Sequence, residues 1–166
     1  MIAIRAAKTA MVAAIALFAS LVAFGNLTDY QTNFVFVQHV LGMDTIFPSS
    51  TIRYRAITDP GLHRAAYALI IAAEAAVAAL CWAAAIFLLR QLRAGAAAFN
   101  RAKALAVTGL TTGFLLWQVG FMSIGGEWFG MWMSPQWNGV ESAFRFVATI
   151  GLVLIFLAMP DGELPD

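Results

Sequence analysis

Long apolar stretches alternate with shorter polar segments along this chain. The stretches cover residues 6–24, 65–89, 104–124 and 140–159. Each has about the 17–25 residues that a helix needs to cross a hydrocarbon core of roughly 30 Å. Strands of a membrane barrel would instead alternate apolar and polar residues over segments of about ten. The pattern therefore predicts an all-α fold, a four-helix antiparallel transmembrane bundle that forms one domain over residues 1–166.

The composition agrees with this pattern and narrows the class of partners. Hydrophobic residues make up 61% of the chain and charged residues 11%, whereas soluble domains are about half apolar and a quarter charged. We therefore expect the lipid bilayer to surround the helices. A net charge of +1 gives no field that would attract nucleic acid, so no nucleic-acid partner is expected. The one cysteine, Cys81, is expected to be a packing residue.

Basic residues are distributed unequally between the two sides of the predicted bundle. An even number of spans places both ends of the chain on one side. That side carries six basic residues close to the membrane: Arg5, Lys8, Arg90, Arg93, Arg101 and Lys103. The opposite side, with outer loops at residues 25–64 and 125–139, carries Arg53, Arg55, Arg64 and Arg145. Because segments rich in Lys and Arg stay in the cytoplasm, we expect both termini there.

The first outer loop carries a helical signal of its own. Apolar residues recur there at intervals of four, three and four positions and would form one face of a helix: Tyr30, Phe34, Val37 and Leu41. This spacing predicts a short amphipathic helix that lies over the bundle or in the membrane interface. Thr28 and Gln31 match a capping box at its start, and Gly42 is expected to end it. Asp59 and Pro60 fit the N-cap and first turn of the next helix.

The second outer loop is short and unusually aromatic. It contains Trp128, Trp132 and Trp137. Tryptophan is enriched at the membrane interface, but this density exceeds what an interfacial belt requires. Either the loop folds down over the bundle, or it forms a docking surface for another membrane subunit. Asn138 and Glu141 match a capping pattern for the fourth span.

Small residues predict where the helices approach one another. Gly109 and Gly113 form a small-xxx-small pattern in the third stretch, and such faces let transmembrane helices pack closely. The second stretch carries alanines close to one face, at Ala72, Ala76, Ala79 and Ala83. We expect the second and third spans to pack tightly within the bundle; a dimer of two chains is the alternative.

Glu74 is the one acid that cannot reach water. It lies nine residues into the second stretch, about 14 Å at 1.5 Å per residue. Gln118 and Arg145 lie at comparable depths, so the three are predicted to form a buried polar layer. Glu74 would pair with Arg145, or stay neutral and bond Gln118 or a backbone carbonyl; pairing of Arg145 with Glu141 is the alternative. Because intramembrane acids are rare, Glu74 is also a candidate proton or cation site.

His39, His63 and Arg64 lie near the predicted outer surface. Bis-histidine haem ligation requires ligands on facing helices at one depth, and no spacing in the sequence supports it. Together with Arg53 and Arg55, these residues are candidates for an outer pocket that takes an anionic headgroup or a quinone. The sequence shows no zinc spacing, nucleophile elbow or phosphate loop, so we expect no metal, no cofactor and no catalytic residue.

Several short segments across the chain match one family. They are FGNLTDY at 24–30, FVQHVL at 36–41 with Met43 and Asp44, YRAIT at 54–58, AFNRAK at 98–103, GGEWF at 125–129, and WNG at 137–139 with FRF at 144–146. Through them the chain resembles a bacterial family of predicted small integral membrane proteins, catalogued as a domain of unknown function. The resemblance implies a four-span protein of the bacterial inner membrane and supplies no activity, cofactor or catalytic residue.

The sequence predicts a non-enzymatic protein, an accessory or scaffold subunit of a larger inner-membrane complex. The aromatic outer loops motivate this prediction, and the expected partner is another membrane protein or a second copy of the chain. One alternative is a small transporter or channel component that uses Glu74. Another is a quinone- or haem-associated electron-transfer subunit that uses His39 and His63.

Overall fold

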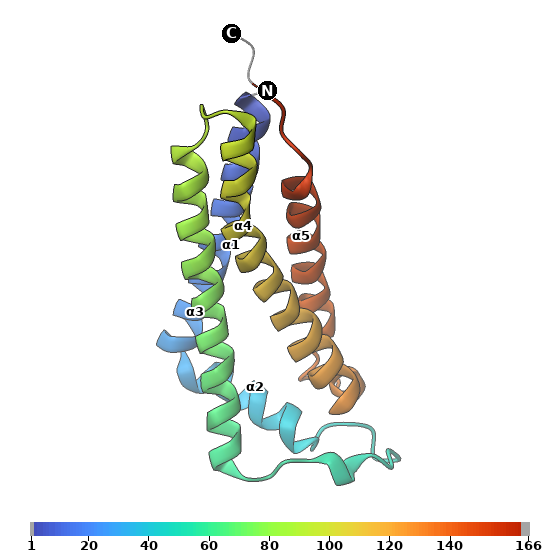
Figure 1. Cartoon of the computed structure of the whole chain (residues 1–166). Helices are drawn as coiled ribbons and strands as arrows, with labels where there is room; N and C mark the ends of the chain where they lie inside the picture. Colours follow the sequence, from blue (N-terminus) through green and yellow to red (C-terminus); the bar gives the residue numbers. More distant parts are fainter. Residues whose placement is uncertain (1, 164–166) are drawn as a thin grey trace.

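The computed structural model describes residues 2–163, and over that range it contains helices and loops without a β-strand (Figure 1). Four helices are long and apolar enough to cross a membrane. They are α1 (Ile2–Thr28), α3 (Pro60–Arg90), α4 (Ala96–Leu115) with its continuation η2 (Leu116–Trp128), and α5 (Val140–Ala158). A further helix, α2 (Tyr30–Gly42), lies in the first loop. The predicted all-α fold with four spans and an additional loop helix is confirmed.

The four long helices run antiparallel, and each packs against the next. α1 packs along α3, α3 along α4, and α4 along α5. α1 begins and α5 ends at the same end of the bundle, which we call the termini end (Figure 1). At the opposite loop end, α2 runs across the bundle beside two short 3₁₀ turns, η1 (Arg53–Arg55) and η3 (Met131–Met133).

The closest approach of α3 and α4 occurs at the small residues of α4. A Cβ atom added at Gly109 would lie 2.9 Å from Cys81 Sγ and 3.2 Å from the backbone nitrogen of Cys81. One added at Gly113 would lie 3.2 Å from Val77 Cγ1 and 3.3 Å from Ile150 Cδ1. The two glycines therefore let the backbones approach, as small residues do between transmembrane helices.

The face of α3 that meets α4 differs from the predicted alanine face. Ala72, Ala76, Ala79 and Ala83 are all exposed on the side that lipid would cover. The buried face instead carries Glu74, Val77, Ala78, Cys81, Ala84, Ala85 and Leu88. Alanine occupies almost every side of this helix, so its distribution could not identify the packed face.

Beyond Gly113 the contacts of the third span change, because α4 widens into the π-helix η2. Its hydrogen bonds span five residues, for example from Phe129 N–H to the carbonyl of Ile124 at 3.0 Å, and long π-helical runs are rare. α3 packs along α4, whereas η2 packs chiefly against α5. η2 leans away from α3 toward the loop end (Figure 1), and α2 lies across the space that results.

Two of the predicted helix boundaries are confirmed and two are wrong. The N-cap of α5 is Gly139 rather than Asn138. Asp59 caps α3 by accepting a hydrogen bond from Leu62 N–H at 2.8 Å, and α2 ends at Gly42 as predicted. Thr28 does not cap α2, because α1 continues to this residue and its hydroxyl donates to the carbonyl of Phe24 at 2.8 Å. α1 therefore runs directly into α2 without the predicted capping box.

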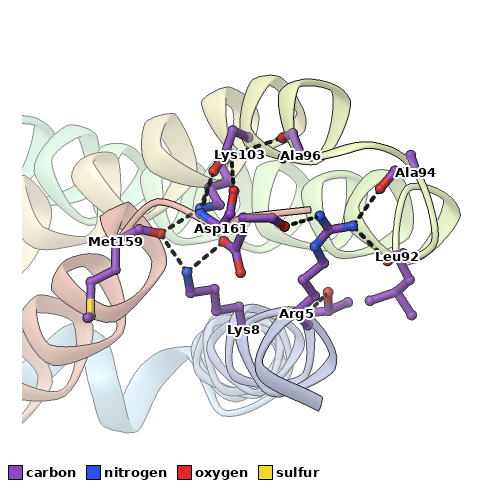
Figure 2. Close-up of polar contacts among 11 residues, drawn as sticks. Arg5, Lys8, Leu92, Ala94, Ala96, Lys103, Met159 and Asp161 are labelled. Atoms are coloured by element: carbon purple, nitrogen blue, oxygen red, sulfur yellow. Dashed lines mark hydrogen bonds and ion pairs between the residues drawn. The ribbon is translucent and has the colours of Figure 1, made fainter. Parts of the chain in front are cut away.

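Three basic side chains are buried at the termini end, where they hold the segment that follows α5 (Figure 2). Lys8 is 1% exposed and Lys103 is 5% exposed. Their ammonium groups lie 2.7 Å and 2.5 Å from the same carboxylate oxygen of Asp161. Both also donate to the carbonyl of Met159, at 2.6 Å and 2.7 Å. This carbonyl belongs to the end of α5, where positive charge is favourable.

The third cation, Arg5, joins the loop between α3 and α4 to the same segment. Its guanidinium donates to the carbonyls of Leu92, Ala94 and Gly162, at 3.1, 2.6 and 2.8 Å. Asn100 exchanges two hydrogen bonds with the backbone of Asp161. We call Arg5, Lys8, Asn100, Lys103 and Asp161 the terminal cluster. It joins α1 and α4 to the loop between α3 and α4 and to the segment after α5. Its charges are paired and hydrogen-bonded, as buried charges must be.

The Asp161 carboxylate carries the negative charge of the terminal cluster. Burial opposes its ionisation, but the hydrogen bonds and charges of Lys103 and Lys8 outweigh burial, so the pKa of Asp161 lies below its usual value. The folded protein consequently holds this proton less tightly than the unfolded chain does. The stabilisation is present above the unfolded pKa of about 4 and is lost as the pH falls through the folded pKa.

Replacing Asp161 with Asn should lower the free energy of unfolding by about 3 kcal/mol at neutral pH, because two buried ammonium groups lose their counter-ion. Thermal or denaturant unfolding in detergent, followed by circular dichroism, measures the change. The stability of the wild type should fall below about pH 4 more steeply than that of Asp161→Asn. The control is Glu141→Gln, whose exposed ion pair lies at 3.7 Å. Equal losses in the two variants would contradict this account of the terminal cluster.

Gly109→Ala should destabilise the bundle by about 1–3 kcal/mol, because the new methyl group would force α3 and α4 apart. Gly151→Ala is the matched control, since a Cβ there meets no atom within 4 Å, and it should be neutral or slightly stabilising. The same unfolding measurement compares them. If Gly109→Ala is as stable as Gly151→Ala, the close approach at Cys81 is not what holds these helices together.

Candidate functional site: a cavity at Glu74

Glu74 is buried where α3 and the third span, α4 with its continuation η2, begin to separate. The residue is 1% exposed and lies one turn from Val77, the residue that contacts Gly113. It is 16 positions from Arg90, or about 24 Å along the helix at 1.5 Å per residue. In a hydrocarbon core of roughly 30 Å, Glu74 therefore lies closer to the loop end than to the termini end.

The polar partner of Glu74 is Asn26, in the last turns of α1. The amide nitrogen of Asn26 donates to Glu74 Oε2 at 2.7 Å. The Tyr67 hydroxyl donates to the backbone carbonyl of Asn26 at 3.0 Å and to its Oδ1 at 3.3 Å. Tyr67 thereby fixes the orientation of the Asn26 amide, with the NH₂ group toward the carboxylate. Within residues 2–163 no side chain or backbone group bonds the other oxygen, Glu74 Oε1.

A cavity of about 180 Å³ adjoins this polar chain. Its polar lining consists of Asn26, Asn33, Tyr67 and Glu74. The remainder is apolar and mostly aromatic, with Val22, Phe36, Val37, Ile70, Trp117, Phe121 and Phe146. These residues come from all four long helices and from α2, so every helix of the loop half contributes to the wall of the cavity. We call it the Glu74 chamber.

A second, apolar chamber of about 210 Å³ lies next to the first, between α2, α3 and η2. The two chambers share Phe36, Val37, Ile70 and Phe121, which stand between them. Its outer edge includes Leu69 and Ile124, whose side chains are 71% and 47% exposed. This chamber therefore reaches the lipid-facing surface between α3 and η2.

The bundle is closed on the other side of Glu74. Toward the termini end, Val77, Cys81 and Leu110 are 0% exposed, and Gly109 packs directly on Cys81. The Glu74 chamber is thus bounded by packed core in the direction of the termini end and faces the loop end and the lipid.

The predicted polar layer of Glu74, Gln118 and Arg145 is not formed. The side chain of Arg145 is 68% exposed and lies 3.7 Å from Glu141 on its own helix. The predicted Glu74–Arg145 pair is therefore wrong, because Arg145 is on the outer face of α5 while the next residue, Phe146, lines the chamber. Gln118 is half-buried, and within residues 2–163 its side chain makes no hydrogen bond.

The predicted outer-pocket residues belong to separate contacts. His39 Nδ1 lies 2.8 Å from Asp44, and its ring stacks on Trp137 with centroids 4.5 Å apart. His63 is buried, and its Nε2 lies 2.7 Å from the carbonyl of Ile57. Arg64 is exposed. Neither histidine lines the Glu74 chamber or the apolar chamber, so the structure does not bring the two together at one ligand site.

The aromatic loop folds onto the first outer loop. The guanidinium carbon of Arg55 lies over the ring of Trp128, 4.6 Å from its centroid. Trp132 packs edge-on against Phe47, with the ring centroids 5.9 Å apart. The hydroxyls of Thr45 and Ser134 join the two loops at 2.8 Å. Trp128 and Trp132 nevertheless remain 53% and 49% exposed.

Comparison with known proteins identifies one family. A family model described as "Predicted small integral membrane protein (DUF2165)" matches residues 4–160. No curated protein gives a significant match to the chain, and neither does any solved structure.

A double-mutant cycle should detect the contact between Asn26 and Glu74. We expect Asn26→Ala and Glu74→Leu to couple by at least about 1 kcal/mol in the free energy of unfolding, because each removes the same hydrogen bond to a charged group. Asn26→Ala combined with Glu141→Leu should be additive within about 0.5 kcal/mol, since those side chains share no partner. Additivity in the first cycle would show that the bond contributes nothing.

Proposed function

The chain belongs to the family of predicted small integral membrane proteins, and from this premise we propose that it is a non-enzymatic membrane protein that binds a small amphipathic molecule at Glu74. One observation carries the proposal. A carboxyl group within the membrane-spanning bundle has one oxygen held by Asn26 and the other without a bond to residues 2–163, and its residue lines a cavity.

The physical argument concerns the oxygen that the protein leaves without a partner. Glu74 Oε1 is not among the fully buried side-chain atoms of residues 2–163 that lack a partner, so it is accessible to a small molecule, and ionisable residues within membranes usually mark functional sites. A molecule in the Glu74 chamber would supply the missing partner of Oε1. Its apolar part would contact the aromatic walls and the adjoining apolar chamber, which together have the composition of a ligand site.

The closed termini side supports binding in preference to conduction. A transporter or channel that uses Glu74 needs a path to both sides of the membrane, whereas Val77, Cys81 and Leu110 are completely buried beneath the chamber. Transport by this protein would require α3 and α4 to separate at Gly109. Flux through proteoliposomes that is abolished by Glu74→Gln would favour transport over simple binding.

An accessory or scaffold role in a larger membrane complex is the second candidate. The observation that favours it is the aromatic surface of the loop end, where Phe47, Tyr54, Trp128 and Trp132 are 50%, 78%, 53% and 49% exposed. Contacts between the two outer loops fix this surface, so it is preformed for another membrane protein or a second copy of the chain. A stoichiometric partner after gentle detergent extraction would support this role, and a lone monomer would count against it.

We also propose that the termini end faces the cytoplasm at the bacterial inner membrane. Six of the ten basic residues of the chain lie at that end, and positive charge is enriched on the cytoplasmic side. In that orientation the Glu74 chamber would be reached from the outer leaflet.

Native mass spectrometry of the gently extracted protein tests the binding proposal. Wild type and Glu141→Leu should release the same small molecule of defined mass, because Glu141 lies on the exposed surface. Glu74→Leu should release several-fold less, because the polar anchor in the chamber is gone. If all three proteins carry the same molecules in equal amounts, the chamber is not the binding site.

A further inference from the structure

We propose that the Glu74 chamber selects a monovalent organic cation, an ammonium group attached to an apolar body. This inference rests on the proposed binding function and names the class of ligand. Four observations carry it: the charge of the lining, the orientation of Asn26, the aromatic walls and the scarcity of oxygen ligands.

The lining of the two chambers carries one acid and no basic side chain. Lys, Arg and His are absent from the described residues that line either chamber. Among residues 2–163, no cationic group lies within ion-pair distance of Glu74. The contrast with Asp161 is direct, because that carboxylate has two ammonium groups within 2.7 Å. A cationic partner for an ionised Glu74 would therefore come from outside the described residues.

The hydrogen bonds around Asn26 favour a carboxylate that accepts. Because the Tyr67 hydroxyl donates to Asn26 Oδ1, the amide presents its NH₂ group to Glu74 Oε2. The other oxygen, Oε1, has no bond to residues 2–163, and an ammonium group in the chamber would be a matching donor for it.

The walls of the chamber suit an organic cation. Trp117, Phe121 and Phe146 line the chamber with Glu74, and aromatic ring faces attract cations within about 6 Å. Two of these rings are held in place by Phe18, which lies 5.6 Å from Trp117 and 4.7 Å from Phe146 between centroids. An aromatic enclosure with one acid is the arrangement that recognises quaternary ammonium groups.

The same walls disfavour a metal ion. Calcium takes 6–8 oxygen ligands and magnesium requires octahedral coordination, and the described residues contain no group of three or more His, Cys, Asp or Glu side chains that could hold a metal. A bare inorganic cation would exchange its hydration shell for the oxygens of at most four polar side chains of the lining. An alkylated ammonium group has a weaker shell and brings apolar surface of its own.

The route into the chamber fits a molecule that dissolves in the membrane. The apolar chamber meets the lipid-facing surface at Leu69 and Ile124, and it adjoins the Glu74 chamber at Phe36 and Phe121. An amphipathic cation would enter between α3 and η2, with its ammonium group directed to Glu74. Its apolar body would remain in the chamber of about 210 Å³.

Two probes of the same shape test the inference. Benzyltrimethylammonium carries one quaternary ammonium group and one ring, and neopentylbenzene is its neutral isostere. Equilibrium dialysis against protein in nanodiscs, with empty nanodiscs as the blank, measures the binding of each. Wild type and Glu141→Gln should bind the cation saturably and at least tenfold more tightly than Glu74→Gln does. The neutral isostere should bind wild type and Glu74→Gln equally.

A second variant keeps the test informative if Glu74→Gln folds poorly. Phe121→Leu retains an apolar wall but loses an aromatic face, so it should weaken binding of the cation at least about threefold and leave the neutral isostere unchanged. Equal affinity of wild type for cation and isostere would overturn the charge selectivity while the binding function stands. Failure of both probes to bind would overturn the inference and the proposed function together.

Discussion

The hydrocarbon core supplies no water, so every charge that this chain places inside its bundle must find a partner within the protein or its ligands. That constraint separates two polar sites with opposite character. In the terminal cluster, Lys8 and Lys103 share Asp161 and the end of α5, and every ammonium group is satisfied. At Glu74 the protein provides one donor for a group with two oxygens. In the first site the carboxylate of Asp161 has its counter-charges within the protein, and in the second site Glu74 has none among residues 2–163.

The shape of the chamber follows from a change of helix type within one span. Gly109 and Gly113 hold α4 against α3, and the π-helical turns that begin at Leu116 carry the chain toward α5. α2 then covers the opening at the loop end (Figure 1). π-Helical segments are often found at functional sites, and here the segment contributes Trp117 and Phe121 to the wall.

Local patterns in the sequence predict the four spans and α2, because span length and helical periodicity depend on neighbouring residues. The partners of the polar groups depend on the depth at which separate helices meet. The apolar stretch ends at Phe24 and so predicts that Asn26 lies in the first loop, yet α1 continues to Thr28 and brings Asn26 to the depth of Glu74. The basic residues of the terminal cluster resemble ordinary interface anchors, so the sequence pattern does not predict the cluster. Only packing shows that Asp161 lies between two of them.

The terminal cluster also has a consequence for the order in which the protein is made. Lys8 belongs to the first span to leave the ribosome, Lys103 to the third, and Asp161 follows the fourth. Until that last segment emerges, both lysines lack their counter-ion and must keep contact with water or headgroups. The bundle can therefore close at this end only after all four spans have been inserted, so the synthesis of the last segment sets the earliest moment of final assembly.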